Sequence, residues 1–245
     1  SANGAILNAD GAILNVTATN LRLEAKDEIG VSGTHLTTSV ATLTVLSMGT
    51  ANGAGIYVTE TNAVTVGTVT VSVSEFTGTT TATVSDAAQS DLVTSAANGN
   101  IVLVATLGNI TLNDGSGGAG MAVSANGNGS VLIDALVGSV TANADVLSGT
   151  GHITMKAGTS IDLTANVDVT TGTPGTVSLD AETGALTMDA TAKVTATGSS
   201  LRVAADGDIT LGALTAANVS VVSRVGAILN AGGAILNVTA TNLRL

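Results

Sequence analysis

Apolar and polar residues alternate along most of the second half of the chain, in short units that begin with glycine. In the unit GDITLGA, which starts at Gly207, Ile209 and Leu211 share one face. Asp208 and Thr210 share the opposite face. A period of two residues is typical of a half-buried strand, and no segment shows the sustained i, i+3, i+4, i+7 spacing of an amphipathic helix. The pattern therefore predicts an all-β protein made of many short strands.

The units come in pairs that recur along the chain. They include GNIVLVA, GNITLND, GSVLIDA, GSVTANA, GHITMKA, GTVSLDA, GALTMDA and GDITLGA, and successive pairs begin at positions 99, 129, 151, 175, 198 and 226. One unit cannot bury its apolar face alone, but stacked units can, because each strand pairs with the strands above and below it. We therefore expect each pair to form one coil of a parallel β-helix (β-solenoid), with coils of about 22–30 residues. A glycine at the head of each unit would allow a tight, often left-handed turn before the strand.

A second repeat has a much longer period. Residues 4–23, GAILNADGAILNVTATNLRL, recur as residues 226–245, GAILNAGGAILNVTATNLRL, after a shift of 222 residues. Of these twenty positions nineteen are identical, and only Asp10 against Gly232 differs. We expect residues 1–245 to form a single solenoid segment, slightly more than one 222-residue tandem repeat, in which residues 24–98 form less regular coils.

Composition narrows the function classes. The chain has no Cys or Trp and only one Phe and one Tyr, which suits a narrow interior filled by small aliphatic side chains. Its net charge is −11 with only 7 Lys and Arg, so no basic patch is available for nucleic acid. No run of about 18 apolar residues is free of polar ones, and we therefore expect no membrane span.

Candidate catalytic chemistry is sparse. Arg and Lys are scattered, whereas polysaccharide-active β-helices need clustered charged side chains on adjacent coils. Asp134, Asp162, Asp180 and Asp189 occur one per unit, which indicates an outward-facing solvated ladder. We therefore expect no enzymatic activity and assign no catalytic residue, with a polysaccharide-active enzyme as the least favoured alternative.

One glycine-rich stretch suggests a cation. NDGSGGAGM, residues 113–121, resembles the calcium-binding glycine-rich nonapeptide, but Ala122 stands where that motif places its aspartate ligand. A weak Ca²⁺ site would have to use Asn113 and Asp114. Apart from that weak candidate we expect no metal and no cofactor.

The doubled GAILN phrase does not alternate cleanly. Either register of residues 11–18 leaves a large aliphatic side chain on the outside. We expect an apolar ridge that packs against another rod or under a covering loop, because exposed apolar patches mark contact surfaces. Its members would be Ile6, Ile13, Ile228 and Ile235.

The paired Gly-x-(Ile/Val/Leu)-x-(Leu/Met)-x-Ala units resemble the repeats of filamentous-haemagglutinin-type proteins, the giant bacterial surface adhesins with tandem β-strand repeats. The resemblance is good over residues 99–245 and 4–23 and weaker over 24–98. It implies a right-handed parallel β-helix, an extracellular or cell-surface location, and a structural or adhesive role.

Taken together, these features favour a structural repeat of an extracellular bacterial filament, sheath or biofilm matrix fibre. An open end of a β-helix is an unpaired edge that recruits further strands. The expected partners are further copies of the chain, joined end to end covalently in tandem or head to tail, with lateral rod contacts or glycans as additional partners. The alternative is the stalk of a large surface adhesin.

Overall fold

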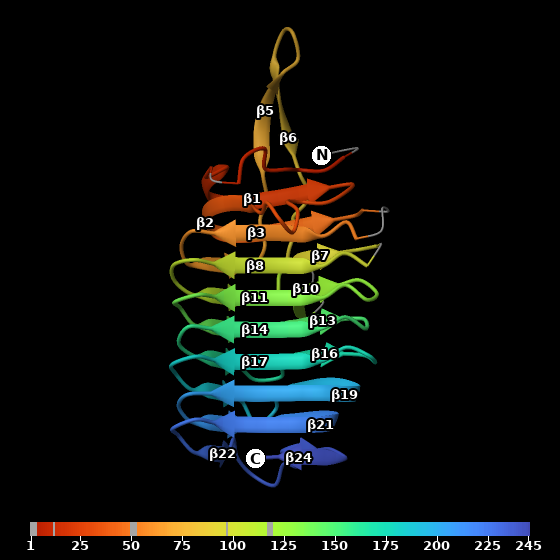
Figure 1. Ribbon diagram of the computed structural model, residues 1–245. Coiled ribbons are helices and arrows are strands. Elements are labelled where there is room, and N and C mark those ends of the chain that lie inside the picture. Colours follow the sequence, from red (N-terminus) through yellow and green to blue (C-terminus); the bar gives the residue numbers. More distant parts are fainter. Residues whose placement is uncertain (1–3, 12, 50–52, 97, 117–119) are drawn as a thin grey trace.

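A computed structural model describes residues 4–11, 13–49, 53–96, 98–116 and 120–245. Over these residues the chain forms 24 strands and no helix, so none of the described segments is a helix long and apolar enough to cross a membrane. Of the described strands, 22 belong to one sheet with parallel pairing. The chain winds into a rod (Figure 1). The predicted parallel β-helix is confirmed.

Three columns of stacked strands form the sides of the rod, here named A, B and C in chain order. Side A contains β3 (Ile56–Glu60), β8 (Ile101–Ala105), β11 (Val131–Ala135), β14 (Ile153–Ala157) and β17 (Val177–Ala181). Side B contains β4 (Val64–Val66), β9 (Ile110–Leu112), β12 (Val140–Ala142), β15 (Ile161–Leu163), β18 (Leu186–Met188), β20 (Ile209–Leu211) and β22 (Ile228–Asn230). Side C contains β7 (Leu92–Thr94), β10 (Met121–Ala125), β13 (Asp145–Ser148), β16 (Asp168–Thr171) and β23 (Val238–Thr239).

Four longer strands pass around the corners between sides. β2 (Leu36–Ser47) pairs with strands of all three sides, and β1 (Val16–Ala25) lies along β2. β19 (Lys193–Ala205) and β21 (Ala213–Ser223) run from side C to side A. The last strand, β24 (Asn242–Arg244), pairs with the side A part of β21.

The strand register measures the length of each coil. On side A the inward residues stack as Ile101, Val131, Ile153, Val177, Leu201, Val219 and Leu243, and successive residues lie 30, 22, 24, 24, 18 and 24 positions apart. One coil is thus shorter than the expected minimum. The expected pair start at 226 belongs to a different side, because Ile228 stacks under Ile209 of side B and not under the unit that begins at 198.

The interior is aliphatic. Inward positions alternate with outward ones along each strand, as in β11, and Ile133 and Met155 are fully buried in successive coils. Burial of such side chains contributes roughly 1.5–3 kcal/mol each. Because strands of neighbouring coils are only about 4.8 Å apart, inward side chains in the body of the rod pack against the corresponding residues above and below them.

The glycines at the unit heads have a different role from the one expected. Gly129, Gly151 and Gly175 stack at the corner before side A, and their φ angles are not positive. Among the glycines that head the units, Gly108, Gly198 and Gly233 have a positive φ, and the others do not. A Cβ on Gly151 would lie 2.2 Å from the carbonyl oxygen of Gly129. The expected left-handed turn is therefore wrong for most of these glycines. Glycine is needed there because the neighbouring coil is so close that it leaves no room for a side chain.

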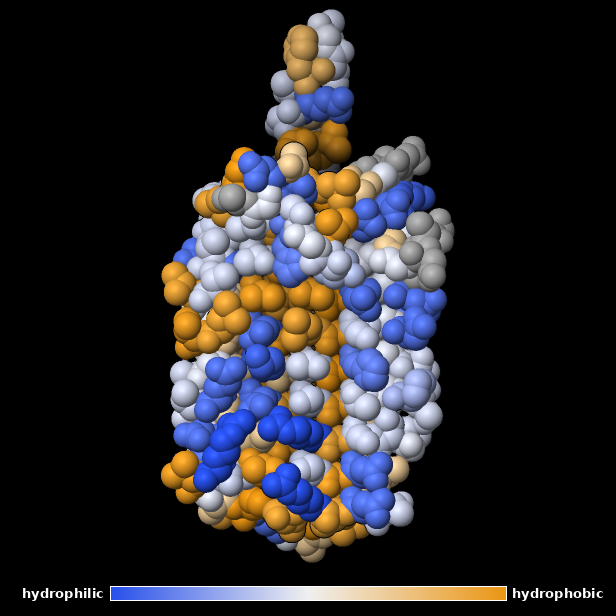
Figure 2. Space-filling model, viewed as in Figure 1, coloured by the Kyte–Doolittle hydropathy of each residue, from blue (hydrophilic) through white to orange (hydrophobic). Residues whose placement is uncertain are grey.

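Within the region expected to form less regular coils, one segment leaves the rod. After β4 the chain forms an antiparallel bridge between Val69 and Gln89. Beyond it, β5 (Ser72–Phe76) and β6 (Thr81–Ser85) form an antiparallel hairpin whose residues are all exposed. The hairpin extends past the coil that contains the N-terminus and stands clear of the rod (Figures 1 and 2). The rest of the region, including β2, β3, β4 and β7, continues the three sides.

Candidate functional site

The repeated twenty-residue segment forms a coil at each end of the rod (Figure 1). We call residues 4–23 the N-terminal copy, of which residue 12 is outside the described part, and residues 226–245 the C-terminal copy. The N-terminal copy pairs only with the coil that follows it, through Ile6 with Ile29 and through β1 with β2. The C-terminal copy pairs only with the coil that precedes it, through β22 with β20 and through β23 and β24 with β21. Within the described residues, each copy therefore leaves one edge of its backbone unpaired, and the two free edges face opposite ends of the rod.

The same side chains point into the rod in both copies. In the C-terminal copy, Ile228, Val238 and Leu243 lie under Ile209, Leu214 and Val219, which are all buried. In the N-terminal copy, the equivalent residues are Ile6, Val16 and Leu21, which lie over Ile29, Thr38 and Leu43. Leu243 is 51% exposed because no coil lies beneath it. At the C-terminal end of the rod, side chains of the aliphatic core are thus exposed to solvent.

The loop between the two GAILN phrases is closed in the same way in both copies. The side-chain carbonyl of Asn8 accepts hydrogen bonds from the Asn15 side-chain amide and from the Asp10 backbone N–H, both at 3.0 Å. In the C-terminal copy, Asn230 accepts the two corresponding bonds, at 3.2 and 3.0 Å. The described residues of the second GAILN phrase, 11 and 13–15 in one copy and 233–237 in the other, belong to no strand. This clasp is local, so the sequence itself specifies it.

The copies nevertheless occupy different sides of the rod. Ile6 stacks on side A, over Ile29 and then Ile56, whereas its equivalent Ile228 stacks on side B. After the loop, β1 runs from the end of side A through B to C, because its partner β2 does so. The C-terminal copy instead runs from B through C and ends on A. One sequence therefore takes two settings: from Ile6 to Leu21 the N-terminal copy advances from side A to side B, whereas from Ile228 to Leu243 the C-terminal copy advances from side B through side C to side A.

The four isoleucines of the expected ridge are divided between the two ends. Ile6 is partly buried against the core, while Ile13 is 53% exposed on the loop. At the other end Ile228 is 37% exposed, and Ile235 is half-buried. They form no continuous surface on one chain, and their contact with another rod stays a prediction.

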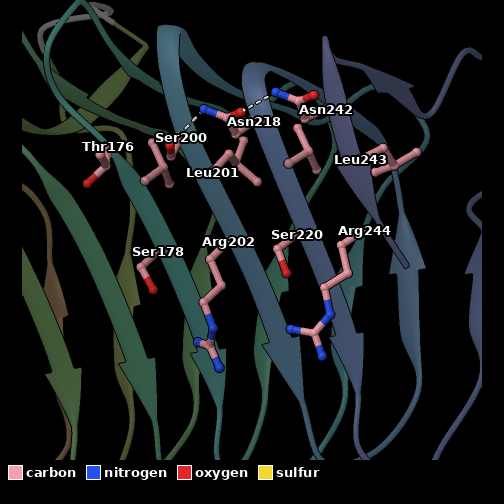
Figure 3. A pocket seen from close by; sticks show the side chains of 12 residues that line it. Thr176, Ser178, Ser200, Leu201, Arg202, Asn218, Ser220, Asn242, Leu243 and Arg244 are labelled. Carbon is pink, nitrogen blue, oxygen red and sulfur yellow. Dashed lines mark hydrogen bonds between the residues drawn. The ribbon is translucent and has the colours of Figure 1, made fainter.

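A shallow groove runs across side A close to the C-terminal end (Figure 3). Its volume is about 590 Å³, and β17, β19, β21 and β24 contribute its walls. Along one wall the Asn242 amide donates to the Asn218 carbonyl at 2.8 Å, and the Asn218 amide donates to the Ser200 hydroxyl at 3.3 Å. Arg202 and Arg244 lie along the other wall (Figure 3). The groove ends at the free edge of β24, so a further coil would lengthen it.

Outward charges on side A are organised by the stacking of the coils. Asp180 accepts from Arg202 at 2.9 Å and from Arg224 at 2.8 Å. Burial alone would raise the pKa of Asp180, but the hydrogen bonds and charges of Arg224 and Arg202 outweigh it and hold the pKa below its ordinary value. In the same column, Lys156 lies 3.9 Å from Asp134, whose pKa is raised mainly by burial.

The other two aspartates of the expected ladder lie elsewhere. Asp162 is on side B, where burial and then the charge of Asp189 raise its pKa. Asp189 follows β18, and hydrogen bonds from the backbone and hydroxyl of Thr191 lower its pKa. All four side chains point outward and remain partly solvated, but they are distributed over two sides and a corner.

One buried carboxylate, that of Glu60, was not predicted from the sequence. Glu60 ends β3 with its side chain inside the rod and has no exposed surface. It accepts the Thr38 hydroxyl at 2.7 Å and the backbone N–H groups of Val40, Thr61 and Asn62 at 3.0–3.2 Å. The available signal was that Glu60 continues the inward row of Ile56 and Val58, where an apolar residue is expected. Because its oxygens are used by neighbouring backbone and hydroxyl donors, Glu60 holds a corner of the coil together.

The two expected calcium ligands lie just after β9. Asn113 accepts a hydrogen bond from the Asn143 amide of the next coil at 2.8 Å, and Asp114 is exposed. Residues 117–119 of the same motif lie outside the described part. Among described residues, no group of three or more His, Asp or Glu side chains is placed to hold a metal ion. Weak Ca²⁺ binding remains a prediction.

Comparison with protein-family models, curated proteins and solved structures gives no match for this chain.

Proposed function

We propose that this chain is a structural repeat of an extracellular filament, sheath or matrix fibre, in which rods join end to end. The observation that carries the proposal is the repeated terminal coil. Two twenty-residue segments that are identical at all but one position bind a neighbouring coil through one edge at one end of the rod and through the other edge at the other end. A segment of this sequence can thus pair on either edge.

The free ends also provide a driving force. Each exposes unpaired backbone N–H and C=O groups together with core-facing leucine and isoleucine side chains, and such edges are templates for pairing with another chain. Stacking of a second copy would bury the exposed faces of Ile228 and Leu243 and would satisfy the backbone groups in one step.

Several expectations from the sequence belong to this proposal. The partners are further copies of the chain, the location is extracellular or at the cell surface, and the protein has no catalytic role and no required cofactor. The resemblance of the glycine-headed units to filamentous-haemagglutinin-type repeats is part of the same proposal, and the parallel β-helix is consistent with it.

One feature favours the alternative of an adhesin stalk. The β5–β6 hairpin leaves the rod and carries the single Phe of the chain, Phe76, which is 70% exposed. Stacking of coils does not need such a projection. A rod that displays the hairpin for binding another surface would use the same architecture, and the two functions are distinguished by whether the purified chain elongates or stays a single rod.

The test is the length distribution of the purified chain by negative-stain microscopy and sedimentation velocity. We expect rods in multiples of one chain length, which become single rods when Leu243→Asp places a charge on the free core section. Leu107→Asp is the matched control, since Leu107 is 60% exposed at a corner in the body of the rod. Circular dichroism establishes that both variants keep their strands. Single rods of the unsubstituted chain at all concentrations would refute the fibre.

A further inference from the structure

The one residue that differs between the two copies lies at a special backbone position. Gly232 has φ +146°, in the region that L side chains rarely adopt. Its counterpart Asp10 has no positive φ. The next residue follows the same division, since Gly233 has φ +63° and Gly11 lies outside that region. The two loops therefore differ in backbone conformation at the point where the sequences differ.

Space does not explain the difference. A Cβ added to Gly232 would meet no atom within 4 Å, so an aspartate side chain would fit into open solvent. The obstacle is the backbone angle itself, because a non-glycine residue in this region is strained whatever its surroundings. The hydrogen bonds of the clasp are also unaffected, since residues 10 and 232 donate in the same way to Asn8 and Asn230.

The two loops lead the chain to different sides of the rod. With Gly232 and Gly233 at positive φ, the loop connects β22 on side B to β23 on side C. With Asp10 and Gly11 at other angles, the loop starts and ends on side A, from Ile6 to Val16. The flanking residues are identical, so this turn is the local feature that separates the two settings.

We propose that the residue at position 10 or 232 selects the edge on which the segment seats. Glycine lets it seat on the edge of β20 and β21, as residues 226–245 do, and aspartate restricts it to the setting seen over β2. Where two chains meet, as in the function proposed above, the N-terminal copy of the second chain is then a poor replacement for the resident C-terminal copy. Chains add coil upon coil and do not exchange their terminal coils.

The first test is independent of assembly. Amide hydrogen exchange is measured on the full chain and on Gly232→Asp, with Ala234→Asp as the control that adds the same charge to the same loop at a residue without positive φ. The Ile209 and Leu214 amides donate to the carbonyls of Ala227 and Asn237, so they report whether the last coil is seated. We expect Gly232→Asp to accelerate exchange at both amides at least fivefold, and Ala234→Asp to leave it unchanged. Equal effects of the two variants, or no effect of either, would overturn the proposal.

The second test identifies the incoming segment as that of a second copy. Asn218 lies beside Asn242, whose equivalent in the N-terminal copy is Asn20. Asn20→Cys with Asn218→Cys, in a chain without other cysteines, can form a disulfide between these positions only when the N-terminal copy of one chain seats on the edge of another.

Cross-linking is compared in three backgrounds: unsubstituted at positions 10 and 232, Gly232→Asp alone, and Asp10→Gly with Gly232→Asp. We expect cross-linked chains to be at least fivefold more abundant in the last background. Only there does the N-terminal copy carry glycine at position 10 while the C-terminal copy that it would replace is weakened by Gly232→Asp. Equal cross-linking with and without Asp10→Gly would refute the selection by this residue. If the purified chain forms no end-to-end rods but Gly232→Asp accelerates amide exchange as expected, the proposed fibre is refuted and the role of this residue is not.

Discussion

Replacement of Gly151 by alanine is the sharpest test of why glycine heads the units. The glycine column at the corner before side A includes Gly129, Gly151 and Gly175, one from each successive coil. A Cβ at Gly151 would lie 2.2 Å from the carbonyl oxygen and 2.5 Å from the carbonyl carbon of Gly129, and 2.6 Å from the carbonyl oxygen of Asn128. All three atoms are backbone, so no side chain can rotate away to make room.

The expected cost follows from the displacement that the methyl group demands. Ordinary contacts lie at 3.4–4 Å, so the two coils have to separate locally by about 1 Å. The neighbouring backbone bond from the Val131 amide to the His152 carbonyl, 2.7 Å long, would be stretched by this movement. Overpacking costs about 1–3 kcal/mol, and a weakened backbone hydrogen bond adds about 1 kcal/mol. We therefore expect Gly151→Ala to lower the free energy of unfolding by about 2–4 kcal/mol.

The measurement is urea-induced unfolding followed by circular dichroism, with Gly33→Ala as the control. Gly33 also lacks a positive φ, but a Cβ there would meet no atom within 4 Å. Because alanine restricts the unfolded chain, the control should be neutral or more stable by about 0.4–1 kcal/mol. If Gly151→Ala unfolds at the same urea concentration as Gly33→Ala, close stacking is not the reason for the glycine column.

Three further substitutions test the polar groups of the rod. Asp180→Asn should destabilise the fold at pH 7. Because the folded pKa of Asp180 lies below the ordinary 3.8, the stability that the carboxylate contributes is present above pH 3.8 and is lost as the pH falls through the lower folded pKa. Thermal melts across this pH range measure the change. Asp162→Asn should have the opposite sign, stabilising the fold at pH 7 with an effect that vanishes below pH 3.8, because the raised folded pKa means that the charged form is disfavoured in the rod. Glu60→Gln should cost about 1–3 kcal/mol in urea unfolding, because an amide nitrogen would replace one acceptor oxygen among buried donors; an unchanged midpoint would show that the carboxylate does not hold the corner.

The coiled architecture was predictable because its signals are local. Alternation with period two recurs along the coils, and a glycine precedes most strands of sides A and B. The short coil between Leu201 and Val219 was missed for a related reason. Its strand lies in the sequence ANVSVVS, residues 217–223, which has no leading glycine because β21 passes the corner as one continuous strand. The next glycine, Gly226, was therefore assigned to the wrong side.

The two settings of the terminal copies were not predictable from the sequence. Local chemistry specifies the asparagine clasp, which is the same in both copies. The difference between Asp10 and Gly232 distinguishes the two loops, but it does not say on which side of the rod Ile6 or Ile228 lies, because that side also depends on the distant coil with which the segment pairs. The hairpin was hidden for a similar reason. Alternation around Val73 and Val84 indicates strands, yet it does not distinguish parallel stacking from the antiparallel pairing that the structure shows.

The mode of joining leaves a measurable trace in the axial repeat of a filament. If chains add without exchange, each junction contains two coils of the GAILN segment, the C-terminal copy of one chain and the N-terminal copy of the next. If the N-terminal copy displaced the resident one from the edge of β20 and β21, each junction would contain one such coil in register. The two repeats differ by one strand spacing, about 4.8 Å. Since Asp10 disfavours the setting that exchange requires, we expect the longer repeat from the unsubstituted chain and the shorter one from the chain with Asp10→Gly and Gly232→Asp. Helical reconstruction of both filaments measures this difference, and identical repeats would contradict the role of this residue in joining.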